Sequence, residues 1–435
     1  MFFIETLKWG SINSLYYFYP HFEDRQTEIL SQTFYFLVVV GSCFLPVLYF
    51  TRHLIASLFN ATIIVDLILP ISLYFFFMLT SLILDHIFIL EKKSHIVIAY
   101  EIINKTLRGI MVIGAAIIYS DVNIIIWSLT IFAFMRFFLI YFYMKNKYGI
   151  KFKNVDSQLL ISQLKYAFPI GAARMVGQIG NKIDKFILTI FLTPAHFAAY
   201  SVAHFGVPFI GVFYSSVSQV VIPQITLETK SNNLEEITRL WHSMINKFIL
   251  VSIPVLTFFL LVAEYLISFL FTEQYLNIVT VYRVSLFIIL IHTLHPSIIL
   301  RAFKETKSIF YSHLFSMIFA IVISYVLIKN YGMIGGALSF ILSSSVRVIL
   351  QLIKVKEVLT LTINNLLPWN SLFLIIGIAL ISLIPSIFLI KLEMNNLETL
   401  LLSGICYSAV LIPFYHFSGV LKYKEVVEFV SSVIR

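Results

Sequence analysis

Runs of about 18 or more predominantly apolar residues recur from one end of this sequence to the other. A run of that length can cross a bilayer as an α-helix, which satisfies its own backbone hydrogen bonds where no water is present. The composition agrees, because 59% of the 435 residues are apolar and 12% are charged, against about 25% charged in a soluble domain. The sequence therefore predicts an all-α polytopic membrane protein.

Thirteen transmembrane helices are predicted, with boundaries good to about three residues. They cover residues 1–19, 29–51, 66–84, 97–119, 122–143, 166–192, 196–222, 247–271, 277–300, 306–328, 333–353, 369–390 and 397–417. If the loop 145–165 is cytoplasmic, the cytoplasmic segments hold 19 basic residues and the opposite loops hold only Arg52, Lys329 and Lys391. Basic residues favour the cytoplasmic side, so this asymmetry predicts the topology.

The spans group into four parts. We expect an N-terminal lobe (1–143), a basic cytoplasmic linker (144–165), a C-terminal lobe (166–354) and two additional helices (368–417). The first span begins at Met1 and carries Glu5 and Lys8, so we expect the N-terminal lobe to be incomplete, with a helix missing upstream.

The segment 223–246 differs from the spans around it. Its apolar residues recur at helical spacing, with charged residues opposite. This pattern indicates an amphipathic helix on the cytoplasmic surface, or equally a linker that is merely helical.

Charged residues inside the spans are the most informative feature, because each costs about 2.5–3.5 kcal/mol at a helix centre. In "GAARMVGQIGNKIDKFILTIF" (171–191), polar residues at i, i+4, i+7 or i+8, and i+11 share one helix face. They are Arg174, Gln178, Asn181 or Lys182, and Lys185. Lys185 alone could reach water by snorkelling. The full set favours a water-filled cavity, in which Asp184 tempers the charge of its lysine neighbours.

Other intramembrane charges leave more than one interpretation open. Glu101 and Lys105 at i, i+4 can pair with each other, which leaves Arg108 unexplained. Arg136, among aromatic residues, could line a cavity or make cation–π contacts.

Two later spans carry similar polar sets. Ser339, Ser343, Arg347 and Gln351 repeat the stripe, although Arg347 could snorkel. Arg283 lies on a span with His292 and His295, but no third ligand is near, so no metal site is expected.

Several chemistries are excluded by what the sequence lacks. It has no G-x-x-x-x-G-K-[ST], G-x-S-x-G or H-E-x-x-H motif and no loop long enough for a catalytic domain, so no enzyme activity and no cofactor is expected. Cys43 and Cys406 lie in apolar runs and are interpreted as buried thiols without a disulfide. The net charge of +9 follows from the topology and does not indicate nucleic-acid binding.

The stretch "FPIGAARMVGQIGNKIDKFILTIFLTPAHFAAYSVAHFGVPFIGVFYSSVSQVVIPQI" resembles the helix pair that opens the C-terminal lobe of polysaccharide flippases. These include the Wzx-type O-antigen flippases of the multidrug/oligosaccharidyl-lipid/polysaccharide exporter superfamily. The matching motifs are Pro169–Gly171, Asp184–Leu188, Ala199–Ala203 and Pro223. "PSIILRAFKETK" and "LIKNYGMIGGALSFILSS" resemble later segments of the same family.

The resemblance implies two helical lobes around a central cavity and transport by alternating access. The cargo would be an undecaprenyl-diphosphate-linked oligosaccharide, flipped across the bacterial plasma (inner) membrane during O-antigen, lipopolysaccharide, capsule or exopolysaccharide biosynthesis. Polymerase and chain-length proteins of the same pathway are further candidate partners, beside membrane lipid.

Site roles follow from the charges and this cargo. Arg174, Lys182 and Lys185 would face the pyrophosphate, aided by Arg108, Arg136 and Arg283 and by the polar groups of Gln178 and Asn181. Asp184 and Glu101 would couple transport to an ion. The alternatives are a cation-coupled multidrug exporter of the same superfamily, an integral membrane glycan polymerase or transferase, or a nonfunctional remnant.

Overall fold

The computed structural model describes residue 8 and residues 11–59, 61–91, 94–149, 155–207, 210–231, 233–271, 273–303, 305–392 and 394–419. Every regular element in these ranges is helical. Nine segments among them are long and apolar enough to cross a membrane by length and composition. The predicted all-α membrane fold is therefore confirmed, whereas the count of thirteen helices stays a prediction.

Two compact units divide the chain, Met1–Ile179 and Gly180–Arg435. The four-part division expected from the sequence stays a prediction. The elements of the first unit are α2 (Ser11–His21), η1 (Glu23–Arg25), α3 (Gln26–Phe50), α4 (Arg52–Leu58), α5 (Ile63–Ser81), α6 (Ile83–Leu90), α7 (Ser94–Tyr119), α8 (Val122–Tyr148) and α9 (Ser157–Gly180).

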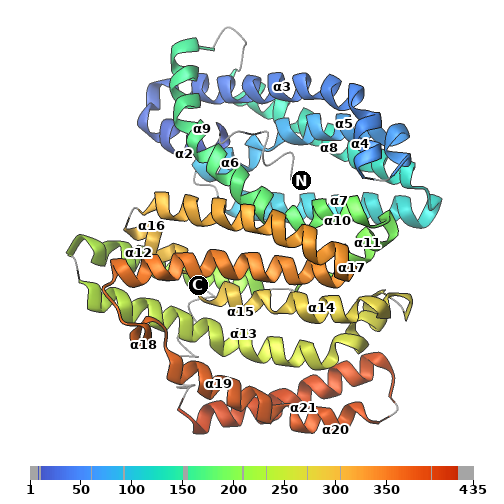
Figure 1. Cartoon of the computed structure of the whole chain (residues 1–435). Helices are drawn as coiled ribbons and strands as arrows, with labels where there is room; N and C mark the ends of the chain where they lie inside the picture. The colour runs from blue at the N-terminus through green and yellow to red at the C-terminus, as the bar shows by residue number, and fades with distance from the viewer. Residues whose placement is uncertain are drawn as a thin grey trace. The chain divides into compact units, whose positions relative to one another are not determined.

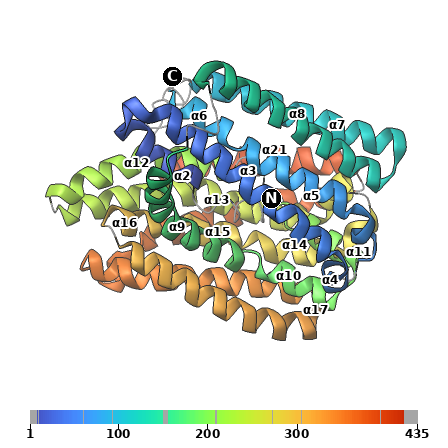
Figure 2. The ribbon, with the colours of Figure 1, turned by 90° about the horizontal axis from the view of Figure 1, so that it is seen from above.

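In the first unit α5 packs against α3 and α8, and α7 lies alongside α8 (Figures 1 and 2). Buried Leu37, Met78 and Ala133 belong to the shared apolar core.

The ends of α8 follow local rules. The Asp121 carboxylate accepts a hydrogen bond from the Asn123 amide, and the helix stops where Gly149 takes a left-handed φ of 56°.

Polar side chains tie α9 to the start of α3. Gln163 Nε2 donates to Thr33 Oγ1 at 2.8 Å, and Gln32 Nε2 donates to Gln163 Oε1 at 2.7 Å. Arg25 and Asp156 form an ion pair at 2.5 Å just outside these helices. The Arg25 guanidinium holds the pKa of the Asp156 carboxyl below its usual value. Buried amides paired in this way fix one register between two helices.

The second unit contains α10 (Ile183–Phe191), α11 (Pro194–Ala203), α12 (Ile210–Ser231), α13 (Leu234–Phe271), η3 (Glu273–Ile278), α14 (Val279–Leu286), α15 (Ile288–Thr293), α16 (Ser297–Ala302), α17 (Thr306–Val358), α18 (Ile363–Leu366), α19 (Trp369–Ser382), α20 (Ile384–Ile390) and α21 (Asn396–Phe417). Helices α19 and α21 pack on α13, and α14 packs on α17 (Figure 1).

Helix α17 is a hairpin of two antiparallel arms, which correspond to the predicted spans 306–328 and 333–353. The chain reverses at Gly332, whose φ of 56° and ψ of −130° are non-helical. Small residues let the arms approach closely: a Cβ atom at Gly335 would lie 2.0 Å from the Leu327 carbonyl oxygen. The hydrogen bonds between the arms are Ser316 Oγ to Ser343 O (2.7 Å), Ser324 Oγ to Ser339 Oγ (2.9 Å) and Gln351 Nε2 to Ser312 Oγ (2.9 Å).

The segment 223–246 does not form a separate helix, which does not support the surface-helix interpretation and leaves that of a helical linker. It comprises the end of α12 and the start of α13, which continues without a break to Phe271. Its apolar face, including Ile237, Trp241 and Met244, is buried in the core of the second unit. Protein, not the membrane surface, covers this face. The periodicity predicted which side of the segment is apolar, but it could not distinguish contact with protein from contact with the membrane surface.

Helix α13 contains Pro254, which cannot donate the usual bond to the carbonyl of Leu250. Tyr415 of α21 donates its hydroxyl to that carbonyl at 3.1 Å.

The two cysteines are free. The expectation that both are buried is wrong for Cys43, which is exposed, and Cys406 is half-buried. An apolar side chain of a membrane helix can face lipid as well as a protein core.

We predict that Gly335→Ala destabilises the fold by roughly 1–3 kcal/mol, because the new methyl group would collide with backbone of the opposite arm. Gly377→Ala in α19 is the matched control, since a Cβ there meets nothing within 4 Å. That control should be neutral or stabilising by up to about 1 kcal/mol. Thermal unfolding of the purified variants in one detergent measures both, and equal melting temperatures would contradict the close contact between the arms.

Candidate functional site

The predicted continuous helix over 166–192 is interrupted in the middle, so that expectation is wrong. Helix α9 ends at Gly180, and α10 begins at Ile183. Lys182 has a non-helical φ of −131° and ψ of 6°. Glycine and asparagine are weak helix formers, which explains where the break falls. Irregular backbone at membrane depth is tolerated only where protein surrounds it or water reaches it, so the break marks a candidate site.

Asp184 lies in the first turn of α10 and is only 2% exposed. Tyr200 of α11 donates its hydroxyl to Asp184 Oδ2 at 2.6 Å. The second oxygen, Oδ1, is also buried and has no hydrogen-bond partner among the residues that the structure describes. An acidic group in the first turn is favoured by the helix dipole. A buried carboxylate with a free oxygen can accept a proton or a cation.

Tyr200 is itself held in place by close packing. A Cβ atom at Gly336 of α17 would lie 3.0 Å from the Tyr200 ring, so the glycine makes room for it. The His204 ring lies 4.2 Å from the Tyr200 ring, and His204 Nδ1 contacts the Tyr200 carbonyl at 3.1 Å. His204 Nε2 lies 3.3 Å from Ser285 Oγ of α14. A buried polar chain therefore runs from Asp184 to Ser285.

Helix α17 adds a cation to the break. Arg347 Nη1 donates to the Asn181 side-chain oxygen. The other members of the predicted stripe, Ser339, Ser343 and Gln351, are buried and hold the two arms of α17 together.

The structure thus brings Asn181, Lys182, Asp184 and Lys185 together at the break. To these it adds Arg347, Tyr200 and His204, which lay outside the predicted site. The stripe on span eleven was the signal for Arg347. Tyr200 and His204 carried none, because a tyrosine and a histidine four residues apart in an apolar run are common in membrane helices.

The remaining predicted site residues have other surroundings. The side chains of Arg174 and Glu101 lie outside the described part of the structure, and Gln178 and Arg108 are half-buried on α9 and α7. Arg136 is buried on α8, with its guanidinium 5.7 Å from the centre of the Tyr100 ring, so it makes the cation–π contact that was one of its two interpretations. Arg283 Nε donates to the Leu260 carbonyl of α13 at 3.1 Å.

Within the described ranges, no group of three or more His, Cys, Asp or Glu residues is placed to hold a metal ion. His292 and His295 are linked through the His292 carbonyl, which accepts from His295 Nδ1.

The chain matches a protein family in sequence and several solved structures in fold. A family model described as "Polysaccharide biosynthesis protein" matches residues 21–280. No curated protein sequence matches the chain. The fold is similar to that of the lipid II flippase MurJ in an inward closed conformation, with a TM-score of 0.79 and 19% identity, covering 98% of this chain and 91% of that one.

Transporters of the MOP superfamily (multidrug/oligosaccharidyl-lipid/polysaccharide exporters) are also similar in fold. An inward-facing multidrug resistance MATE family transporter has a TM-score of 0.65 and 12% identity, covering 82% of this chain and 86% of that one. A Pyrococcus furiosus transporter has a TM-score of 0.56 and 11% identity, covering 82% and 83%. At these identities the likeness establishes the fold alone.

We predict that Tyr200→Phe destabilises the protein by about 1–3 kcal/mol, because Asp184 Oδ2 loses its donor while it stays buried. Tyr331→Phe is the matched control, since Tyr331 is 63% exposed. The loss should shrink in an Asp184→Ala background, which a double-mutant cycle on thermal unfolding would measure. An undiminished loss in that background would mean that Tyr200 acts through packing alone.

Proposed function

Because this chain belongs to the polysaccharide biosynthesis protein family, we propose that it is a flippase for a polyprenyl-diphosphate-linked oligosaccharide. It would move this cargo across the bacterial plasma membrane by alternating access. The observation that carries the proposal is the group of cations at the helix break, where Arg347 contacts Asn181 next to Lys182. Membrane helices rarely keep such charges unless they bind something.

The chemistry of the cargo supports this assignment. A lipid-linked diphosphate has about two negative charges, which cannot enter about 30 Å of hydrocarbon unaccompanied. Arginine matches phosphate oxygens with a planar pair of donors, and lysine adds mobile point charges. Arg347, Lys182 and Lys185 would replace water around the diphosphate, and the polyprenyl tail would stay in lipid. The lipid II flippase of similar fold is named for a lipid-linked substrate, which supports the same class of cargo here.

Asp184 would supply the energy coupling. Its buried carboxylate, with Tyr200 on one oxygen and the other oxygen open, can take up and release a proton or a small cation. It lies two residues from Lys182, so a change in its charge would alter the attraction of the break for an anionic head group. Binding of the ion and of the cargo would then be linked.

We predict that Lys182→Glu combined with Arg347→Glu stops export of the surface glycan while the protein level stays normal. Each charge-assisted contact to phosphate contributes about 1.5–3 kcal/mol, so each loss should weaken cargo binding roughly 10- to 100-fold. Arg347→Lys should keep part of the activity because the charge remains without the bidentate geometry.

The control for charge reversal is Lys329→Glu, at an exposed position of α17 far along the first arm. In cells, lipid-linked repeat units should accumulate on the cytoplasmic face in the double variant alone. Normal export in the double variant would rule out the cationic site. Single units accumulating outside would instead indicate the polymerase alternative.

We further predict that Asp184→Asn uncouples transport from its ion. The amide keeps the shape and can still accept from Tyr200, but it cannot change its charge. Transport in inverted membrane vesicles should lose its response to an imposed proton or sodium gradient, whereas Asp66→Asn, at an exposed acid on α5, should keep it. An unchanged response in Asp184→Asn would place the coupling group elsewhere.

A further inference from the structure

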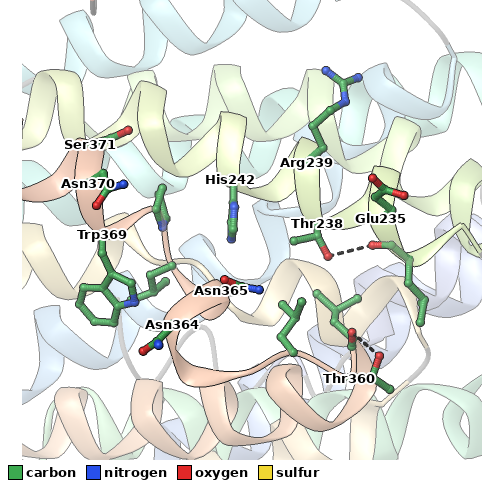
Figure 3. A pocket seen from close by; sticks show the side chains of 15 residues that line it. Glu235, Thr238, Arg239, His242, Thr360, Asn364, Asn365, Trp369, Asn370 and Ser371 are labelled. Atoms are coloured by element: carbon green, nitrogen blue, oxygen red, sulfur yellow. Dashed lines mark hydrogen bonds between the residues drawn. The ribbon is translucent and has the colours of Figure 1, made fainter.

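A pocket with both polar and apolar lining lies in the second unit, and none of its lining residues belongs to the helix break. It has a volume of about 770 Å³ and is formed by the first turns of α13, the end of α17, α18 and the start of α19. Figure 3 shows His242 of α13 and Asn365 of α18 on facing sides of it. Small-molecule sites usually fall between about 300 and 1,000 Å³. In the predicted topology this end of the unit is cytoplasmic.

Side-chain amides dominate the polar lining. Asn364, Asn365 and Asn370 line the pocket together with Ser371, and none of their side chains has a hydrogen-bond partner among the described residues. Each amide offers two donors and one acceptor oxygen, which suits a ligand whose neighbouring groups both donate and accept. Vicinal hydroxyl groups of a sugar have this property.

The charges in the pocket argue against an anionic ligand. Arg239 is already engaged, because its Nε and Nη2 donate to the two carboxylate oxygens of Glu236 at 2.7 and 2.5 Å. Glu235 adds a negative charge at the rim, and His242 Nε2 contacts the Leu366 carbonyl at 3.2 Å. A phosphate or an anionic lipid head group would therefore meet no free arginine and one repelling carboxylate.

The walls of the pocket are held in a defined shape. Trp369 Nε1 donates to the Ile363 carbonyl at 3.1 Å, which closes the loop between α18 and α19. Thr360 takes a left-handed φ of 52° at the C-terminal cap of α17, where the Thr360 and Leu361 amides donate to the Glu357 and Lys356 carbonyls. Trp369 and Leu361 supply apolar wall beside the amides, as the C–H faces of a sugar ring require.

From these features we propose that the pocket binds an uncharged mono- or disaccharide at the cytoplasmic end of the second unit. The proposal goes beyond the function proposed for the helix break, because it requires neither translocation nor a diphosphate. Binding on the purified chain can therefore fail while glycan export continues, and export can fail while binding persists.

The test is saturation-transfer difference NMR on the full chain in phosphatidylcholine nanodiscs, which contain no sugar. N-acetyl-D-glucosamine and D-galactose are the probes, and glycerol 3-phosphate is the anionic comparator. We expect millimolar binding of at least one sugar to the unaltered protein. Asn364→Ala combined with Asn365→Ala should weaken it about tenfold or more, because two sets of amide hydrogen bonds are lost.

The matched control is Asn330→Ala, at an exposed asparagine of α17 outside the pocket, which should bind like the unaltered protein. Asn370→Ala with Ser371→Ala repeats the test on another wall if the first double variant unfolds. Absence of transfer to either sugar would overturn the proposal. So would equal binding by the double variants, or tighter pocket-dependent binding of glycerol 3-phosphate, which would indicate a lipid head-group site.

Discussion

A backbone amide or carbonyl in the hydrocarbon core has no water to bond, and this constraint governs the whole structure. Most of the described chain meets it with uninterrupted helix. Where a proline frees a carbonyl, as Pro254 does for Leu250, a side chain from another helix takes the vacant position. At Asn181 and Lys182 the helix is interrupted, and polar side chains from two other helices converge near the break.

The intramembrane polar groups consequently serve two different purposes. One set holds helices together: the serines and Gln351 of α17 pair across the hairpin, Arg283 binds a carbonyl of α13, and Arg136 packs over a tyrosine ring. The other set surrounds the helix break and includes a buried carboxylate with one open oxygen. The first set contributes to packing between helices. The proposed function rests on the second set, which includes the buried carboxylate of Asp184.

The two proposed sites differ in chemistry in a way that suits a lipid-linked glycan. The helix break has cations and one buried acid, which suit a diphosphate and a coupling ion. The pocket beside α18 has free amides and no free arginine, which suit neutral sugar hydroxyls. A cargo with both kinds of group would need both kinds of recognition, since a site built for one is a poor host for the other.

Much of the fold followed from local rules that act along the chain. Apolar length predicted membrane helices, and their period predicted which side of the 223–246 segment is apolar. The motifs around Asp184 indicated the superfamily. The prediction of one continuous helix was wrong at Gly180–Lys182. The length of an apolar run does not reveal a helix break when the residues on both sides of it are apolar. The sequence also could not predict that protein buries Trp241 or that Cys43 is exposed, because lipid and protein core favour the same side chains.

The sequence by itself determined that the chain folds into membrane helices and which charged residues those helices carry. These properties depend on composition and spacing alone. Which charges remain available was decided only by the tertiary structure. Arg347 and Asn181 are 166 residues apart, and Tyr200 reaches Asp184 only because Gly336 leaves room for its ring. Pairing between helices depends on which faces meet, and that is a property of packing that no single helix encodes.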